Sequence, residues 1–484
     1  MQYTSTRNDL LSISAAEAIL TGLAPDGGLF VPASFPALDV TECYGLSYPE
    51  TAKKVLSLFL TDYDEAFLEV AVTQVYSDAN FDGKAGFVKK VSEGTFALEL
   101  WHGPTCAFKD YALQIMPKLL CEAKKLQNDT GITKILVATS GDTGKAALAG
   151  YANLSDIQIA VFYPNDGTSE IQRLQMATQE GDNVAVYAVN GNFDDAQRGV
   201  KRAFADAALA AALAQKGEAL SSANSINWGR LVPQIVYYFY SYAQLVAQKE
   251  ITNGDAVSFC VPTGNFGDIL AGYYAKQMGL PIDKLVCASN TNNVLTDFLE
   301  TGIYDANRTF YKTSSPSMDI LISSNLERLL YHITQDSAQV AAWMAELAAT
   351  GRYTVPAAVL QKIQETFDCG YAAEDDVANQ IAKQMVQNDY LCDPHTAVAF
   401  LVAERTDIAT PCVVLSTASP YKFAGDVLRP LGEVVPQDAF EAMHALYAKT
   451  KLPIPQSLAA LQQKPVRFTQ TIEADAIVQI ARDF

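Results

Sequence analysis

A lysine stands directly before a predicted helix start, in the segment His102-Gly-Pro-Thr-Cys-Ala-Phe-Lys-Asp110. The helix dipole disfavours a cation at this position. The same field, together with burial beside Phe108 and its apolar neighbours, would lower the pKa of the Lys109 amine. An amine with a lowered pKa serves as a nucleophile or proton carrier near neutral pH. A lysine that reaches the surface or pairs with Asp110 is the competing interpretation of this segment taken alone.

A glycine-rich turn lies between the apolar run 257–261 and an apolar helical pattern. Its residues are Gly264, Asn265, Phe266, Gly267 and Asp268. The free N–H groups of such a turn and the helix dipole together make an anion site. Glycine can take positive φ and also lets the backbone approach a phosphate closely. A plain connection between a strand and a helix explains the segment equally well on its own.

A second turn of this kind, Thr139-Ser-Gly-Asp-Thr-Gly144, follows the apolar run 135–138. It superficially resembles a P-loop, which requires glycine, four residues and then Gly-Lys-Ser/Thr. Thr139 replaces the first glycine and Ala146 replaces the metal-binding hydroxyl, so a nucleotide triphosphatase is excluded. A site for a small carboxylate or phosphate remains, and so does a simple capped helix start with Asp142 or Thr143 as the cap.

The three turns belong to a repeated pattern of short apolar strands and helices. Strands are expected at 95–100, 135–138, 157–163, 184–189, 257–261, 285–289 and 413–415, and helices at 111–126, 144–152, 193–214, 230–249 and 269–278. Continuously apolar strands that alternate with helices are typical of parallel sheets covered on both faces. A chain of 484 residues accommodates two such sheets.

The chain divides into three predicted regions. Residues 1–92 form an N-terminal subdomain, 93–425 a catalytic region of two α/β lobes, and 426–484 a C-terminal extension that packs on it. Within the catalytic region, 335–392 is expected to be largely helical. Asp393 and Pro394 then predict another helix start, with the aspartate as its cap.

Composition excludes several classes of protein. The net charge is −19 and no basic run is present, which argues against nucleic acid or a membrane surface as a partner. The most apolar long stretch, 231–247, is short and interrupted by Pro233, so no membrane span is expected. Eight scattered cysteines and four distant histidines predict reduced thiols in a cytoplasmic protein without a catalytic metal. The N-terminal residues resemble neither a signal peptide nor a transit peptide.

Seven segments in a fixed order resemble threonine synthases. They are HGPTCAFKD, ATSGDTG, NSINWGR, PTGNFGDILAGYYAKQMGLP, SPSMDILISSNLERLL, DPHTAVA and LSTASPYKF, and TSTRN and GLAPDGGLFVP near the N-terminus match as well. The resemblance implies the α/β tryptophan-synthase-β-like fold (fold type II) of pyridoxal 5′-phosphate enzymes, with two open, mostly parallel sheets. It also implies a lyase reaction, in which O-phospho-L-homoserine and water give L-threonine and phosphate in the last step of threonine biosynthesis.

The resemblance also implies roles for individual residues. Lys109 corresponds to the lysine that holds pyridoxal phosphate as a Schiff base and then transfers protons, and Thr417 to the hydroxyl that faces the pyridine nitrogen. The residues that correspond to the cradle of the cofactor phosphate are Gly264, Asn265, Phe266, Gly267 and Asp268. The residues that correspond to the substrate-carboxylate site are Ser140, Asp142 and Thr143. Because a carboxylate would repel Asp142, we expect Asp142 to accept from a hydroxyl or a backbone N–H.

The phosphate of the substrate requires a second anion site with a cation. We predict this site in the segment 224–230, with Ser225 and Asn227 as ligands and Arg230 as a bidentate clamp. Arg173 is the alternative cation.

Some positions depart from the family pattern, and other functions remain open. Cys106 stands where a bulkier apolar residue is frequent, and Ser419 where relatives often carry histidine. We interpret Cys106 as a packing residue, and His102 and His395 as hydrogen-bonded structural residues. The same site would serve a phospholyase that releases 2-oxobutyrate, ammonia and phosphate, or a non-catalytic module that only binds the cofactor. Both a monomer and a homodimer fit the sequence.

Overall fold

The computed structural model describes residues 1–165 and 168–484, and its largest sheet has six strands in the order β14-β11-β10-β15-β5-β4. The edge strand β4 is antiparallel to its neighbour, and the other pairs are parallel. The inner strands are apolar and buried, as the sequence predicts. The strands are β4 (Phe87–Ser92), β5 (Thr95–Glu99), β10 (Val257–Pro262), β11 (Ile282–Ser289), β14 (Phe367–Tyr371) and β15 (Cys412–Ser416).

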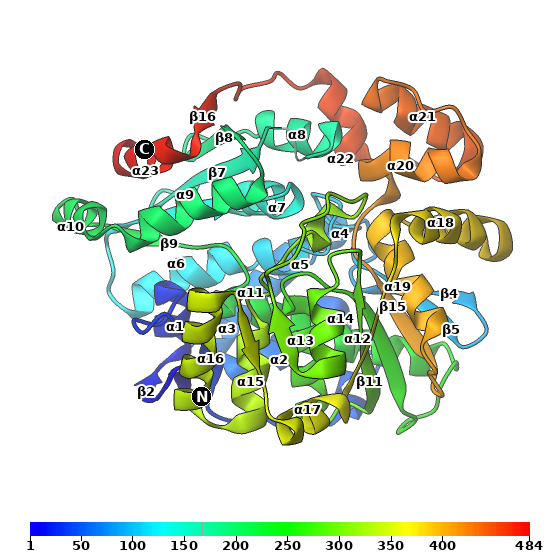
Figure 1. Ribbon diagram of the computed structural model, residues 1–484, viewed down its shortest axis with the longest axis horizontal. Coiled ribbons are helices and arrows are strands. Elements are labelled where there is room, and N and C mark those ends of the chain that lie inside the picture. The colour runs from blue at the N-terminus through cyan, green and yellow to red at the C-terminus, as the bar shows by residue number, and fades with distance from the viewer. Residues whose placement is uncertain (166–167) are drawn as a thin grey trace.

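A second sheet has five parallel strands in the order β16-β8-β7-β6-β9. They are β6 (Ile132–Ala138), β7 (Ile157–Pro164), β8 (Val184–Asn190), β9 (Glu218–Ser221) and β16 (Thr471–Glu473). Helices α7 and α9 pack against this sheet, and the two sheets lie in separate lobes (Figure 1). The expected architecture of two open, mostly parallel sheets flanked by helices is confirmed.

Three of the predicted helices are interrupted. The region 111–126 forms two helices because Pro117 has no N–H to donate to the preceding turn. The region 193–214 divides at Asp206, whose carboxylate accepts from the Leu209 N–H at 2.9 Å and caps the second helix. The region 230–249 contains a 3-10 turn at Pro233. The resulting helices are α5 (Asp110–Leu113), α6 (Met116–Leu126), α9 (Phe193–Ala205), α10 (Ala207–Gln215), α11 (Trp228–Leu231) and α12 (Ile235–Ala247).

Three helices begin at turns that line the candidate site. They are α7 (Asp142–Tyr151), α13 (Gly267–Gln277) and α19 (Pro394–Arg405). The predicted cap of α19 is confirmed, because the Asp393 carboxylate accepts from the N–H groups of His395 and Thr396. In the described part of the chain, no helix is long and apolar enough to cross a membrane.

The N-terminal residues form a small antiparallel sheet with helices beside it. The elements are β1 (Tyr3–Ser5), β2 (Asn8–Ile13), β3 (Phe30–Pro32), α1 (Ala15–Thr21), α2 (Tyr48–Phe59) and α3 (Glu65–Val75). This part shares one hydrophobic core with the larger sheet. The rings of Tyr3 and Phe59 lie 5.3 and 5.6 Å from the Trp228 ring, which joins the N-terminal part to α11.

The region 335–392 is mostly helical but also contains two strands that the sequence analysis did not predict. Its elements are α16 (Ser337–Thr350), β13 (Arg352–Thr354), α17 (Ala357–Gln364), β14 and α18 (Glu374–Asn388). Strand β14 contains Asp368 and Gly370, which are depleted in strands, and it lies at the sheet edge. Its pairing with β11 therefore depends on tertiary structure.

The last sixty residues wrap around the outside of the molecule. From α21 (Ala439–Thr450) the chain passes α22 (Gln456–Ala459), runs over α8 (Glu170–Ala177) and reaches β16 and α23 (Ile477–Asp483), as the red segment of Figure 1 shows. Strand β16 pairs with β8, so this segment completes the second sheet.

Candidate active site

A cavity lies at the carboxyl ends of β6, β10 and β15, between the two lobes, where α/β folds commonly bind ligands. It encloses about 900 Å³ including its opening to solvent. Most of the predicted site residues line it, namely Lys109, Ser140, Asp142, Thr143, Ser225, Arg230, Gly264, Asn265, Gly267, Asp268 and Thr417.

Three predicted residues have other positions. Phe266 is fully buried, and its ring lies 5.5 Å from that of Phe367 in the core. The Asn227 side chain caps α11 by accepting from the Gly229 N–H, and it donates to the Ile19 carbonyl. Arg173 forms a bidentate pair with Glu170 on α8 and is not among the described residues that line the cavity. The side chains of Phe266 and Asn227 therefore support the site from outside it.

The Lys109 amine is buried and faces the cavity. Its Nζ lies 3.3 Å from Ser317 Oγ and 3.8 Å from Asp142 Oδ2. Burial lowers the pKa of Lys109 to about 8, with the charge of Asp142 acting in the opposite direction. The competing interpretation is wrong, because the Asp110 carboxylate accepts from Thr105 and Gln114 instead of the lysine. Lys109 therefore has the burial and the lowered pKa that the sequence predicts for a reactive amine.

The loop that precedes Lys109 is held by the loop that follows β15. Cys106 has a left-handed backbone with φ of 59°, and its carbonyl accepts from the Ser419 N–H at 3.1 Å. Ala107 pairs with Ala418, and the Phe108 N–H donates to the Thr417 carbonyl at 2.8 Å. These backbone contacts bring the Thr417 side chain to the wall that Lys109 also lines.

Asp142 at the start of α7 has a partner that the sequence analysis missed. Its Oδ1 accepts from the Lys422 ammonium at 2.6 Å and from the Gln172 amide at 2.8 Å. The expectation of a hydroxyl or backbone donor is therefore wrong. Although burial opposes ionisation, the charges of Lys422 and Lys109 hold the pKa of the Asp142 carboxyl well below its usual range.

The glycine-rich turn before α13 uses its glycines for close approach instead of positive φ. The positive φ in this turn, 61°, belongs to Phe266. A Cβ on Gly264 would lie 2.6 Å from the Ser317 carbonyl oxygen, which no real contact allows. Asp268, which follows Gly267, accepts from the Ile269 N–H through its Oδ1 atom. Burial raises the pKa of the Asp268 carboxyl to about 6. The turn thus packs Gly264 directly against the 316–319 loop.

Arg230 supplies a guanidinium to the cavity. It donates to the Ala223 carbonyl at 2.9 Å and to Thr143 Oγ1 at 3.2 Å, so both acceptors are neutral oxygens. Burial lowers its pKa to about 10, which still leaves it charged at neutral pH. The contact with Thr143 joins α11 to the first turn of α7. Arg230 is therefore available for an anion near that helix start.

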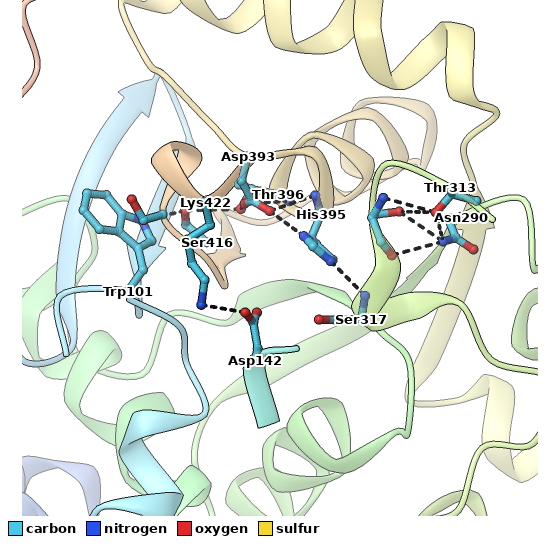
Figure 2. A network of polar contacts seen from close by, with 12 residues as sticks. Trp101, Asp142, Asn290, Thr313, Ser317, Asp393, His395, Thr396, Ser416 and Lys422 are labelled. Atoms are coloured by element: carbon cyan, nitrogen blue, oxygen red, sulfur yellow. Dashed lines mark hydrogen bonds and ion pairs between the residues drawn. The ribbon is translucent and has the colours of Figure 1, made fainter. Parts of the chain in front are cut away.

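The 316–319 loop forms a wall of the cavity that the sequence analysis did not assign to the site. His395 Nε2 accepts from the Ser317 N–H at 3.1 Å, and Nδ1 lies 2.6 Å from Asp393 Oδ2 (Figure 2). At its other side the loop is tied by Asp319 to Asn290 and Thr313. The segment SPSMDI and the DPH turn both belong to the resemblance, but neither carries a periodicity that would indicate a shared wall. His395 is thus hydrogen-bonded, as predicted, and it also lines the cavity.

The other residues singled out in the sequence lie outside the cavity. His102 is buried with its Nε2 2.7 Å from Glu99 Oε2, as a structural histidine would be. Burial raises the pKa of the Cys106 thiol to about 11, which disfavours a nucleophilic thiolate. Ser419 is buried and accepts from the Tyr421 N–H. Within the described residues, no three His, Cys, Asp or Glu side chains come together as metal ligands.

Three family models match consecutive parts of the chain. Residues 2–76 match the threonine synthase N terminus, 86–418 match pyridoxal-phosphate-dependent enzymes, and 396–480 match the threonine synthase C-terminal model. The model for pyridoxal-phosphate-dependent enzymes alone covers more than half of the chain and includes the whole of the cavity described above.

Curated relatives and solved structures agree with these models. Threonine synthase from Pseudomonas aeruginosa is 38% identical over 430 residues, which is 87% of this chain and 89% of that protein. Human threonine synthase-like 1 is 40% identical over 431 residues, but this chain spans only 58% of its length. The structure of pyridoxal-phosphate-bound threonine synthase from Brucella melitensis has a TM-score of 0.87 at 37% identity, covering 100% of this chain and 99% of that one. Yeast threonine synthase has a TM-score of 0.86 at 33% identity, with 100% and 97% coverage.

Proposed function

Because the chain belongs to the threonine synthase family of pyridoxal-phosphate-dependent enzymes, we propose that it converts O-phospho-L-homoserine and water to L-threonine and phosphate. The observation that carries this proposal is the position of Lys109. Its buried amine, with a pKa of about 8, faces a cavity that also contains two helix N-termini and the Arg230 guanidinium. An amine beside two anion sites suits a substrate and a cofactor that each carry a phosphate.

The hydrogen-bond donors of the cavity suit the phosphate of pyridoxal phosphate. The Ile269 N–H at the start of α13 donates to the Asp268 carboxylate, but the Gly267 N–H has no acceptor one turn earlier in the helix, and the helix dipole attracts an anion to this position. We therefore assign the cofactor phosphate to Gly264, Asn265 and Gly267, with Phe266 and Asp268 contributing backbone groups. Lys109 would carry the cofactor through its amine. We assign the Thr417 hydroxyl to the pyridine nitrogen.

The choice of a hydroxyl at Thr417 affects the type of reaction. Pyridoxal phosphate, when bound, withdraws electrons from the carbon atoms of the substrate. A hydroxyl, unlike a carboxylate, does not require the pyridine nitrogen to be protonated, which makes this withdrawal weaker. Weaker withdrawal suits elimination and addition better than transamination. The position of Thr417 on the cavity wall supports this assignment.

Lys109 is the proton carrier in this proposal. Its Nζ removes the proton from the substrate α-carbon. In later steps of the reaction it returns protons to other carbon atoms. A pKa of about 8 allows both directions near neutral pH. Because Lys109 is only 8% exposed, exchange of its protons with bulk water is limited.

The two acidic groups of the substrate need separate sites. We assign its carboxylate to Ser140, Thr143 and the N–H groups at the start of α7. Asp142 is compatible with this anion because its charge is already matched by Lys422 at 2.6 Å. We assign the substrate phosphate to Arg230 and Ser225, because this guanidinium has only neutral acceptors. Asn227 then acts indirectly, through its cap on α11.

Product analysis tests the proposal. The full-length protein, loaded with pyridoxal phosphate, is incubated with O-phospho-L-homoserine while phosphate, threonine, 2-oxobutyrate and ammonia are measured together. We expect equal amounts of phosphate and threonine. Phosphate with 2-oxobutyrate and ammonia would identify a phospholyase, and no phosphate would identify a non-catalytic module. L-Homoserine, which lacks the phosphate leaving group, is the matched control substrate.

We place the reaction in the cytoplasm, because all eight cysteines are free and suit a reducing compartment.

A further inference from the structure

Lys422 is a buried cation to which no binding or catalytic contact is assigned above. It lies in the 3-10 turn η4 (Pro420–Phe423) and is 1% exposed. Its ammonium donates to Asp142 Oδ1 at 2.6 Å and to the Thr105 carbonyl at 3.0 Å. Figure 2 shows this side chain reaching from its own turn to the start of α7. Lys422 therefore joins three segments of the site, namely the Lys109 loop, α7 and the loop after β15.

Asp142 lies between two lysine amines at unequal distances. Lys422 Nζ is 2.6 Å from Oδ1, whereas Lys109 Nζ is 3.8 Å from Oδ2. The shorter distance permits a charge-assisted hydrogen bond, and the longer one does not. A buried carboxylate requires a counter-charge, since an unpaired ion in the interior is strongly destabilising. In this structure Lys422 provides that counter-charge, and Lys109 does not have to.

Charged groups on four elements act on the Lys109 amine. Arg230 on α11 and Lys422 on η4 lower the pKa of its amine, while Asp142 on α7 and Asp268 on α13 raise it. His395 on α19 approaches through Ser317, whose hydroxyl is 3.3 Å from Nζ. With Lys422 present, the group of Lys422, Asp142 and a neutral Lys109 has no net charge. Without it, the same group would carry one negative charge and would attract a proton to Lys109.

We propose that Lys422 is a positioning residue that acts as the permanent counter-ion of Asp142 and so leaves the Lys109 amine free to react. The ammonium of Lys109 releases one proton to solvent, and the lone pair left on Nζ is the reacting pair. Asp142 takes no proton in this step. The inference rests on the proposed role of Lys109, but it is tested below on the protein without cofactor.

The test measures the reactivity of Lys109 in the full-length protein after removal of the cofactor. Acetic anhydride labels neutral amines, and mass spectrometry gives the labelled fraction of Lys109 as a function of pH. In Lys422→Met we expect the midpoint to rise by about one pH unit, because a like charge is lost and Asp142 then pairs with Lys109. In Lys422→Arg, which keeps the charge, the midpoint should stay close to that of the unmodified chain.

A compensating pair of variants separates a charge effect from a structural one. Asp142→Asn alone should lower the midpoint, because it leaves the Lys422 charge unmatched beside Lys109. Lys422→Met combined with Asp142→Asn replaces one neutral pair by another, so its midpoint should return toward that of the unmodified chain. If Lys422→Met does not fold, Asp142→Asn and the double variant still test the proposal.

Lys124 provides a matched control outside the site. It is also buried, with its Nζ 3.0 Å from Asp129 Oδ2 and 2.6 Å from the Gly131 carbonyl. Lys124→Met should leave the Lys109 midpoint unchanged. An unchanged or lowered midpoint in Lys422→Met, or a double variant without compensation, would overturn the proposal. Because labelling requires no turnover, failure of this inference is distinguishable from failure of the proposed reaction.

Discussion

The Phe108 N–H donates to the Thr417 carbonyl oxygen at 2.8 Å, and this bond holds the Lys109 loop against the loop that follows β15. Lys109 and Thr417 are far apart in sequence, yet both line the cavity. They are brought together because Phe108, which precedes Lys109, bonds to the Thr417 backbone, and Ala107 pairs with Ala418. The pairing places the amine that would carry the cofactor and the hydroxyl assigned to its ring on one rigid unit. Such preorganisation is what a site that transfers protons repeatedly needs.

Arg230→Ala should raise KM for O-phospho-L-homoserine by about ten- to a hundredfold, because a charge-assisted contact to the substrate phosphate is lost. The value of kcat should change less, since the amine and the cofactor site are untouched. Steady-state kinetics over a wide substrate range measures both constants.

Arg173→Ala is the control for this prediction. Arg173 pairs with Glu170 on α8, so its removal should leave KM almost unchanged. An unchanged KM in Arg230→Ala, or a larger effect in Arg173→Ala, would show that the clamp is wrongly assigned.

The rate at which cofactor-free protein attaches pyridoxal phosphate to Lys109, here called the capture rate, should depend on pH through the lowered pKa of this lysine. Capture requires the neutral amine, whose fraction rises about tenfold per pH unit below the pKa. Since burial lowers this pKa to about 8, the capture rate of cofactor-free protein should rise from pH 6 and level off above pH 8. Stopped-flow absorbance after addition of pyridoxal phosphate measures the rate. A rate that is still rising near pH 10 would indicate an ordinary lysine.

Lys109→Met should stabilise the cofactor-free protein at neutral pH. The pKa of Lys109 is about 8 in the folded chain, whereas the ordinary value for lysine, which we take for the unfolded chain, is 10.5. Folding at pH 7 therefore buries a charged ammonium, which is unfavourable. The penalty fades as pH rises from 8 to 10.5, because the folded form loses its proton before the unfolded form does. We expect a gain of about 3 kcal/mol in the free energy of unfolding at pH 7 and a smaller gain at pH 10. Urea denaturation at both pH values checks this, and an equal gain at both would contradict it.

His395 and His102 form a matched pair of buried histidines with different expected effects. Each lies within 2.7 Å of a carboxylate, but only His395 also accepts from the 316–319 loop through the Ser317 N–H. His395→Ala removes the acceptor of this partly buried N–H, which costs about 0.5–1.5 kcal/mol and loosens a wall of the cavity. We expect kcat/KM to fall about tenfold or more in His395→Ala and clearly less in His102→Ala. Equal losses of kcat/KM in the two variants would mean that both histidines only stabilise the fold.

Local sequence patterns predicted the elements that carry the site. The apolar runs that became β6, β10 and β15 are short and uninterrupted, so their type and their parallel arrangement follow from local pattern. The turns after β6 and β10 begin helices where the sequence analysis expects them. The cap at Asp393 is equally local, since the N–H groups that donate to its carboxylate lie two and three residues away.

Contacts between distant segments could not be predicted in this way. Asp142 and Lys422 are 280 positions apart, and no local rule relates them. The same holds for His395 and Ser317, and for β16, which pairs with β8 across nearly 300 residues. Phe266 shows a further limit, since a large apolar residue takes the left-handed conformation that the neighbouring glycines suggested for themselves. Its ring is buried against Phe367, which compensates for the unfavourable backbone.

Chemical fixation of the cofactor identifies the lysine that carries it. The protein loaded with pyridoxal phosphate is treated with borohydride, which fixes the cofactor to its lysine, and the peptides are then identified by mass spectrometry. The account predicts a single modified residue, Lys109, and no modification or turnover in Lys109→Ala. Lys145 on α7 is a second lysine whose pKa burial lowers to about 8. Modification at Lys145 or Lys422 instead, or a loaded and active Lys109→Ala protein, would contradict this assignment.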